Sequence, residues 1–140
     1  MRRISKLFMS SVMLAGATLV AVGVQAQGGG AASATAMKSP VPPTPASITA
    51  GAAAYKKYCA FCHGPQATGN GPLAPEGSNP PDLTDATWSH GSTDGEIHAV
   101  IVKGVGEGSA MVPFEGKLPD QDIWHIINFL RSIGPKGAPR

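Results

Sequence analysis

The chain has 140 residues, of which 42% are hydrophobic and only 14% are charged, so it is long enough for one domain with tails. Its net charge of +2 and the lack of any long run of like charges exclude a polybasic nucleic-acid-binding protein and an acidic disordered tail. Two cysteines are too few for a disulfide framework. The 18 glycines and 13 prolines indicate that much of the chain forms turns, loops or linkers.

Residues 1–26 have the pattern of a secretory signal peptide. Arg2, Arg3 and Lys6 precede an apolar run from Leu7 to Val24, within the candidate anchor segment 4–24, and Val-Gln-Ala at its end is a small-x-small cleavage pattern. We expect cleavage after Ala26, although the run is also long enough to stay as a membrane anchor. Cleavage leaves 8 Lys and Arg against 9 Asp and Glu, a net charge of −1. The protein is therefore predicted to be periplasmic, with membrane contact only if this segment is retained.

Residues 27–47 are rich in Gly, Ala and Pro and contain almost nothing to bury, which predicts a linker. Residues 48–140 are left to form the folded domain. A core of that size is marginal unaided and often needs a metal or a cofactor.

Three helices are predicted and no segment of 48–140 alternates as a strand does, so the expected fold class is all-α, with three or more short helices and long loops. The helices are expected from about Thr49 to Ala60, from the cap Thr93 to Lys103, and from Pro119 or Asp120 to Ile133. Thr93 and Glu96 form a capping box at the start of the second helix, and Gly104 ends it.

Two long stretches rich in Gly and Pro, 64–92 and 104–118, separate these helices. Loops of this length in a compact domain usually have a function. Three short helices offer too little surface for the apolar residues of the loops, which a large apolar cofactor would cover. Those residues are Leu73, Leu83, Trp88, Val105, Met111, Val112, Phe114 and Leu118.

Cys59, Cys62 and His63 form the pattern C-x-x-C-H, the attachment signature of c-type haem. Two thiols at this spacing on one turn can each add to one vinyl group of the porphyrin. The adjacent histidine then lies beneath the iron and can bind it. The pattern therefore predicts one covalently attached haem c, with His63 as an iron ligand.

Other interpretations of the two cysteines stay open. A thioredoxin-like redox pair favours a βαβ context, which is not predicted here. A structural zinc site needs four ligands, and a plain disulfide leaves His63 without a role. An exported metal-binding or thiol protein without haem is the corresponding function.

The second iron ligand is predicted to be Met111, the one methionine after the linker. It lies in a loop framed by Gly and Pro, which can direct a thioether at a metal. The alternatives are core packing for Met111, ligation by His90, His98 or His125, or an open iron site.

With C-x-x-C-H early, Met111 following and an amphipathic helix at the end, the chain resembles the class I monohaem cytochromes c of bacteria over nearly all of 48–134. Gly51 and Tyr55 resemble the Gly/aromatic pair of the family's first helix. Ile126 and Phe129 resemble the residues of the last helix that cross against it. The resemblance implies a close crossing of these two helices around a His/Met-ligated haem.

The resemblance also implies roles for two loop residues. Pro81-Asp82-Leu83 is similar to the family's Pro-x-Leu segment, so the Pro81 carbonyl would accept the Nδ1 proton of His63. Trp88 looks like a haem-pocket aromatic that could donate to a propionate, with plain core packing as the alternative. The lysines do not indicate a partner, since Lys56, Lys57, Lys103 and Lys117 stand among nine acids.

These observations predict a single-electron carrier rather than an enzyme, as a monomer or as a subunit of a complex. The resemblance implies a quinol-oxidising complex or a periplasmic dehydrogenase as donor, and an oxidase, reductase or peroxidase as acceptor. Two alternatives stay open. One is a haem-based peroxidase or gas-sensing protein with a displaceable sixth ligand. The other is an electron-entry subunit of a larger complex, for which a tether raises the effective concentration.

Overall fold

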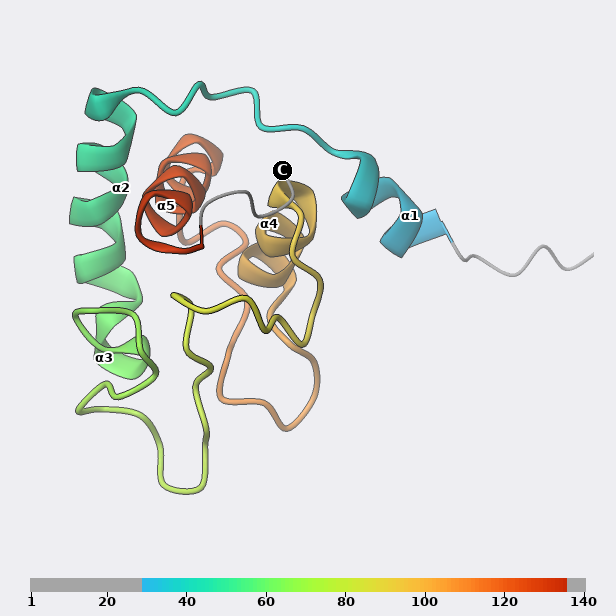
Figure 1. Cartoon of the computed structure of the whole chain (residues 1–140). Helices are drawn as coiled ribbons and strands as arrows, with labels where there is room; N and C mark the ends of the chain where they lie inside the picture. The colour runs from blue at the N-terminus through green and yellow to red at the C-terminus, as the bar shows by residue number, and fades with distance from the viewer. Residues whose placement is uncertain (1–28, 136–140) are drawn as a thin grey trace, which may run out of the picture.

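The computed structural model describes residues 29–135, which form five helices and no strand (Figure 1). The helices are α1 (Gly29–Ala36), α2 (Pro45–Tyr58), α3 (Ala60–His63), α4 (Asp94–Lys103) and α5 (Asp120–Ile133). The predicted all-α class with short helices and long loops is therefore confirmed. The predicted signal peptide, residues 1–26, lies outside the described residues. Within the described range, no helix is long and apolar enough to cross a membrane.

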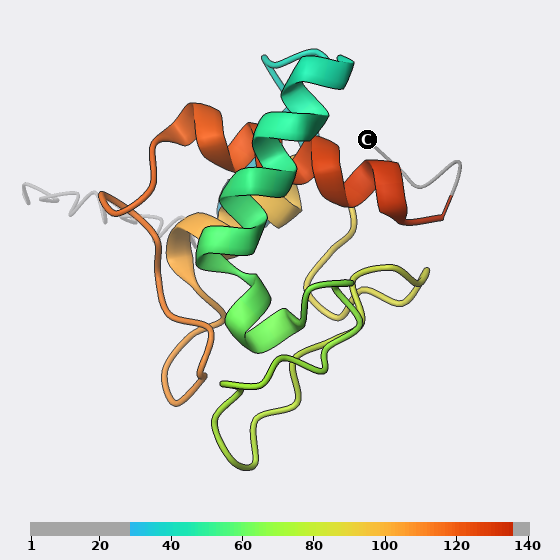
Figure 2. The same cartoon turned by 90° about the vertical axis from the view of Figure 1, so that its left-hand side faces the viewer.

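Helices α2 and α5 cross closely, as Figure 2 shows. The crossing requires Gly51, because a Cβ added there would lie 1.9 Å from the backbone oxygen of His125. Beside it the rings of Tyr55 and Phe129 pack 5.2 Å apart at 47°. This is the close crossing that the resemblance implied, and it fixes the end of α2 from which the cysteine motif follows.

The predicted ends of α4 and α5 are confirmed. Thr93 Oγ1 accepts from the Glu96 backbone N–H at 3.3 Å, and Glu96 accepts from the Thr93 N–H at 2.9 Å, which completes the capping box. Gly104, with φ +71°, follows the last residue of α4. Helix α5 covers Asp120–Ile133, as the sequence predicted.

Helix α2 begins four residues earlier than predicted, at Pro45. Thr44 explains the earlier start, because its side chain accepts from the Ser47 N–H at 3.2 Å. Proline suits the first turn, where its missing N–H costs nothing. The prediction placed this part of the chain in the linker.

The predicted linker 27–47 is also not free of structure. Its helix α1 packs against α4, where Thr35 Oγ1 donates to Glu96 at 2.8 Å. Further along, Asn128 of α5 donates to the Val41 carbonyl at 3.1 Å. Small residues explain the contact of α1, since the backbone of Ala34 lies where a side chain at Gly95 would be. The segment from residue 29 onward therefore lies against the domain rather than apart from it.

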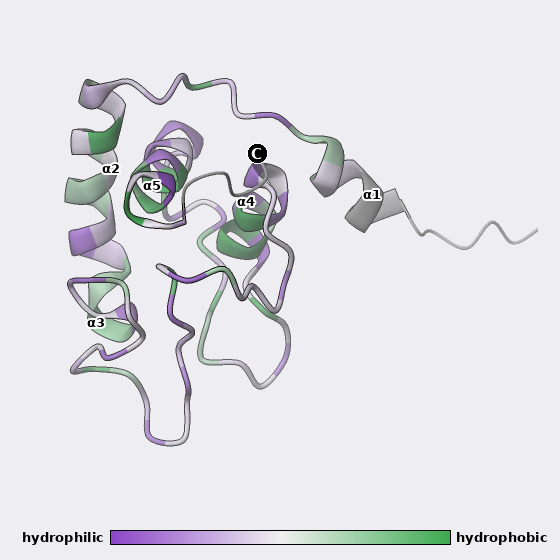
Figure 3. Ribbon diagram, in the orientation of Figure 1, coloured by the Kyte–Doolittle hydropathy of each residue, from purple (hydrophilic) through white to green (hydrophobic). Residues whose placement is uncertain are grey.

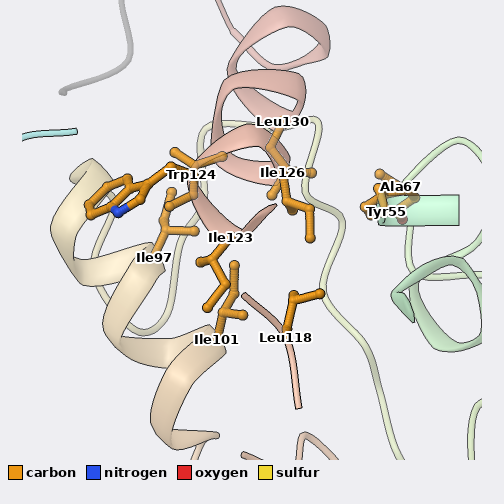
Figure 4. Close-up of a cluster of buried hydrophobic side chains, with 10 residues drawn as sticks. Tyr55, Ala67, Ile97, Ile101, Leu118, Ile123, Trp124, Ile126 and Leu130 are labelled. Atoms are coloured by element: carbon orange, nitrogen blue, oxygen red, sulfur yellow. The ribbon is translucent and has the colours of Figure 1, made fainter. Parts of the chain in front are cut away.

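The hydrophobic core is one cluster of buried side chains (Figure 4). Side chains of α4 and α5 pack together with Leu118, and Tyr55 of α2 and Ala67 of the first long loop complete the cluster. Figure 3 shows apolar patches on α2, α4 and α5, whereas the long loops have a mixed or polar character. The core members that Figure 4 labels on the α4 and α5 side are Ile97, Ile101, Leu118, Ile123, Trp124, Ile126 and Leu130.

A buried ion pair joins α5 to the start of α4. Arg131 Nε donates to Asp94 Oδ1 at 2.8 Å, and both side chains are at most 5% exposed. The guanidinium also donates to the Ser92 carbonyl and lies 6.0 Å from the centre of the Trp88 ring. This pair therefore connects the end of the first long loop, residues 64–93, to α4 and α5.

Candidate haem site

A cavity of about 970 Å³ lies between α2, α3, α4, α5 and the two long loops. Its walls include core residues from three helices, among them Tyr55, Ile97 and Leu130. Cys59, Cys62, His63 and Met111 all line it. The structure thus brings together all four residues predicted to bind the cofactor and its metal.

The cysteine motif folds as a separate turn after α2. The predicted single helix ends at Tyr58, and Cys59 caps it by donating its N–H to the Tyr55 carbonyl at 2.8 Å. The chain then restarts as α3, in which His63 N–H donates to the Cys59 carbonyl at 2.9 Å. Gly64, with φ +79°, ends the turn. One short turn therefore holds both thiols and the imidazole against the cavity.

The environment of Cys59 does not favour redox chemistry at its thiol. Both cysteines are free. Burial, with a smaller effect from Cys62, raises the pKa of the Cys59 thiol to about 12. A reactive thiol of a redox pair needs a lowered pKa, so this site lacks the property that the thioredoxin-like alternative requires.

Burial lowers the pKa of His63, and the hydrogen bond to Pro81 opposes that effect. The neutral imidazole is the form that binds a metal. Its Nδ1 lies 3.4 Å from the Pro81 carbonyl oxygen, the partner that the resemblance implied. If Nδ1 carries the proton, Nε2 is left free to bind iron.

Tyr55 stabilises the cysteine turn through a hydrogen bond. Its hydroxyl donates to the Gly64 carbonyl at 2.7 Å, and burial raises the pKa of the phenol. Because Tyr55 also packs on Phe129, the cysteine turn is connected directly to the crossing of α2 and α5.

Met111 belongs to the second loop, which holds its backbone at two points. Its carbonyl accepts from the Val105 N–H at 3.1 Å, and its N–H donates to Ser109 Oγ at 3.1 Å. Gly104 allows the loop to fold back, since a side chain there would lie 2.5 Å from the Met111 carbonyl oxygen. The side chain is half-buried at the cavity wall.

Two of the three alternative histidine ligands have other partners. His98 Nε2 lies 2.6 Å from Asp120 Oδ1, and the ring stacks on Trp124. His125 Nδ1 lies 2.8 Å from Ser47 Oγ between α2 and α5. His90 lines the cavity and is exposed. Among the alternatives, only His90 shares the cavity with His63.

Trp88 lines the same cavity from the first loop. Its Nε1 donates to the Asp85 carbonyl at 3.2 Å, so the indole N–H has a partner within its own loop. Its contact with Arg131, which sequence reasoning missed, joins this wall to α5. The predicted donation to a propionate stays a prediction.

The cavity and its donors fit haem c. The cavity is lined by apolar members of the core, including Tyr55, Ile97 and Leu130, as a large apolar group requires. Two free thiols, an imidazole and a thioether are the donors that attach a c-type haem and bind its iron. Among the residues that the structure describes, the cavity wall contains two acidic side chains, Glu76 and Asp82, and no lysine or arginine.

Comparisons with known proteins agree with this fit. The family model for the cytochrome c oxidase, cbb3-type, subunit III, matches residues 46–130. A curated relative, the cbb3-type cytochrome c oxidase subunit FixP of Sinorhizobium medicae, is 33% identical over 93 residues. The match covers 61% of this chain and 30% of that relative, so the chain spans less than a third of its length.

Two solved structures share the fold. One is the reducing HAO-like protein complex Kustc0457/Kustc0458 of Kuenenia stuttgartiensis, with a TM-score of 0.63 and 26% identity over 72% of this chain and 49% of that one. The other is cytochrome cL of Methylophaga aminisulfidivorans, with a TM-score of 0.54 and 27% identity over 64% of this chain and 55% of that one. The chain therefore belongs to the cbb3-type subunit III family of cytochrome c domains, whose cofactor is covalently bound haem c.

Proposed function

We propose that this protein is a single-electron carrier in a periplasmic respiratory chain, and not itself an enzyme. The observation that carries the proposal is the cavity that brings Cys59, Cys62, His63 and Met111 together against the apolar core. The cavity fits haem c in its volume, its apolar lining and its donor residues.

The four residues have distinct roles in this proposal. Cys59 and Cys62 hold haem c by thioether bonds, and His63 and Met111 bind its iron. When bound, haem c supplies an iron that takes up and releases one electron. The contact from Pro81 fixes the orientation of the His63 ring and leaves its other nitrogen for the metal.

The walls of the cavity adjust the redox potential. Apolar side chains such as Ile97, Ile101 and Leu130 keep water out and disfavour the extra positive charge of the oxidised state. The thioether of Met111 favours the reduced state in the same direction. Because α2, α5 and the backbone of the Met111 loop hold both ligands in place, we expect little rearrangement between the two oxidation states.

A second candidate is an electron-entry subunit of a larger complex. The curated relatives favour it, because their names describe subunits of a cbb3-type oxidase. In that case the periplasmic donor would be a quinol-oxidising complex or a dehydrogenase, and the acceptor a redox centre of the same assembly. The residues of the haem site would have the same roles in both cases.

Carbon monoxide binding to the reduced protein separates an electron carrier from a peroxidase or gas sensor. At neutral pH the wild-type protein should not bind the gas readily, because the thioether of Met111 would bind the iron in its place. Met111→Ala should bind it quickly, as seen in the visible spectrum of the reduced protein. Ready binding by the wild-type protein would contradict the carrier and favour the sensor or enzyme.

A further inference from the structure

The two loops that form the cavity carry charges of almost one sign. The first loop, residues 64–93, contains Glu76, Asp82 and Asp85 and no Lys or Arg. The second loop, residues 104–119, contains Glu107, Glu115 and one lysine. Glu76 and Asp82 line the cavity itself. Hydrogen bonds from Thr84 lower the pKa of Asp82, so its carboxylate stays ionised at neutral pH.

Large apolar side chains are exposed on the same loops and on α3. Phe61 is 52% exposed, Leu73 is 65% exposed and Val112 is 51% exposed. Leu73 N–H donates to the Phe61 carbonyl at 2.9 Å, which places these two residues together beside Cys62. Val112 lines the cavity next to Met111. Apolar surface is therefore exposed next to both the cysteine turn and the Met111 loop.

The described residues contain fewer lysines than acids, although Lys57 Nζ lies 4.7 Å from the centre of the ring of Tyr58, which lines the cavity. Lys56 and Lys57 belong to α2, and Lys103 is the last residue of α4. Lys117 lies at the end of the second loop, where its ammonium donates to the Pro113 carbonyl at 3.0 Å. No lysine or arginine within residues 29–135 lines the cavity. Helix α1 packs on α4, away from the tips of the two loops (Figure 1).

We propose that Phe61, Leu73 and Val112, together with the acidic side chains of the two loops, form a docking surface for a redox protein that presents lysines and arginines around an apolar patch. We call this surface the acid-rimmed face. Its proposed role depends on the proposed electron-carrier function. Its negative charge attracts a basic partner over about one Debye length and speeds the encounter. The apolar side chains then provide a small contact, which suits a transient electron-transfer complex.

Paramagnetic mapping tests the location of the acid-rimmed face without any electron transfer. Hexaamminechromium(III) is a redox-inert cation that broadens amide signals near its binding place. In two-dimensional amide spectra of the reduced, haem-loaded protein, we expect broadening first around Glu76, Asp82 and Glu107. Broadening centred on Asp120 and Asp122 at the start of α5 would overturn the proposal.

Oxidation by two small complexes, one a cation and one an anion, tests whether the charge of the acid-rimmed face controls the rate of electron transfer. The reduced protein gives one electron to tris(phenanthroline)cobalt(III), an apolar cation that becomes cobalt(II), or to hexacyanoferrate(III), an anion that becomes hexacyanoferrate(II). With rising ionic strength, the rate with the cation should fall and the rate with the anion should rise. Glu76→Gln combined with Glu107→Gln should lower the rate with the cation about threefold at low ionic strength.

Asp122→Asn is the matched control, because it removes one acid from α5 and should leave both rates within about 20% of wild type. The opposite dependence on salt, or no dependence, would overturn the acid-rimmed face while leaving the electron carrier intact. A protein that takes up covalent haem but transfers no electron to either oxidant would contradict the proposed function instead.

Discussion

The crossing of α2 and α5 and the two long loops differ in what holds them. At the crossing, Tyr55 and Phe129 pack beside Gly51, and Asn128 donates to Ser47 Oγ at 2.9 Å. In the loops, only Ala67 and Leu118 among the apolar side chains are buried. The helices thus fold by packing on one another, whereas the loops surround the cavity. We conclude that the helices supply stability and that the loops depend on the cofactor for theirs.

Arg131→Met should have the largest effect, because it breaks the one buried ion pair that links helices and loop in the described part of the chain. Removing the guanidinium leaves Asp94 buried without its partner, which costs about 3–5 kcal/mol of the free energy of unfolding. Guanidinium chloride unfolding of the haem-loaded protein, followed by far-ultraviolet circular dichroism, measures the loss.

Two further variants test whether the loss comes from the pair. Arg131→Lys keeps the charge but not the second hydrogen bond to Ser92, so it should lose less stability than Arg131→Met. Arg131→Met combined with Asp94→Leu removes both charges and should recover part of the loss. Equal stability of Arg131→Met and the double variant would show that the unpaired carboxylate of Asp94 is not the cause of the loss.

Gly51→Ala should have the next largest effect. The added Cβ would lie 1.9 Å from the His125 oxygen and 2.9 Å from the Phe129 Cβ, so α2 and α5 must move apart. We expect a loss of about 3 kcal/mol, measured by the same unfolding experiment. Ala53→Ser is the control, since it adds one atom to an exposed position of the same helix. A Gly51→Ala protein as stable as wild type would mean that the crossing is looser than described.

Thr93→Ala should have a smaller effect, because it removes the cap of a single helix. Thr93 Oγ1 accepts from the Glu96 N–H, and losing such a cap costs about 1 kcal/mol. Thr93→Ser keeps the acceptor and should be close to wild type. If both variants lose the same stability, packing of the threonine methyl group, and not capping, is the cause.

Acid should weaken the same cap, by the smallest effect of the series. Hydrogen bonds from Thr93 and Thr35 lower the pKa of Glu96 to about 2 from its ordinary 4.5. Because the pKa is lower in the folded state, this contribution is complete above pH 4.5 and is lost as the pH falls towards 2. Stability measured over that range should decline less steeply in Glu96→Gln. An unchanged slope would show that other carboxylates dominate.

The helices and the motif could be predicted because their signals are local. The capping box of Thr93 and Glu96, the stop at Gly104 and the apolar face of α5 each lie within one turn or one helix. The C-x-x-C-H pattern likewise predicts haem attachment from five consecutive residues. The loop framed by Gly and Pro predicted Met111 as the second iron ligand. The structure places both of these donor segments at one cavity.

What the sequence did not reveal depends on residues far apart along the chain. Arg131 and Asp94 are 37 positions apart, and nothing near either of them predicts their ion pair. Thr35 and Glu96 are 61 positions apart, and no local pattern predicts their contact. A linker was therefore predicted for residues 27–47. The break at Cys59 was missed because alanines and lysines around it favour one continuous helix.

Absorption spectra of the haem-loaded wild-type, Met111→Ala and Met37→Ala proteins test the central claim most directly. Met37, the other methionine of the described residues, packs beside Gly95 and not at the cavity. Haem that stays attached after denaturing extraction, with a far-red thioether-to-iron band in wild type and Met37→Ala but not in Met111→Ala, is the result we predict. Extractable haem, or a band that persists in Met111→Ala, would contradict the site described here.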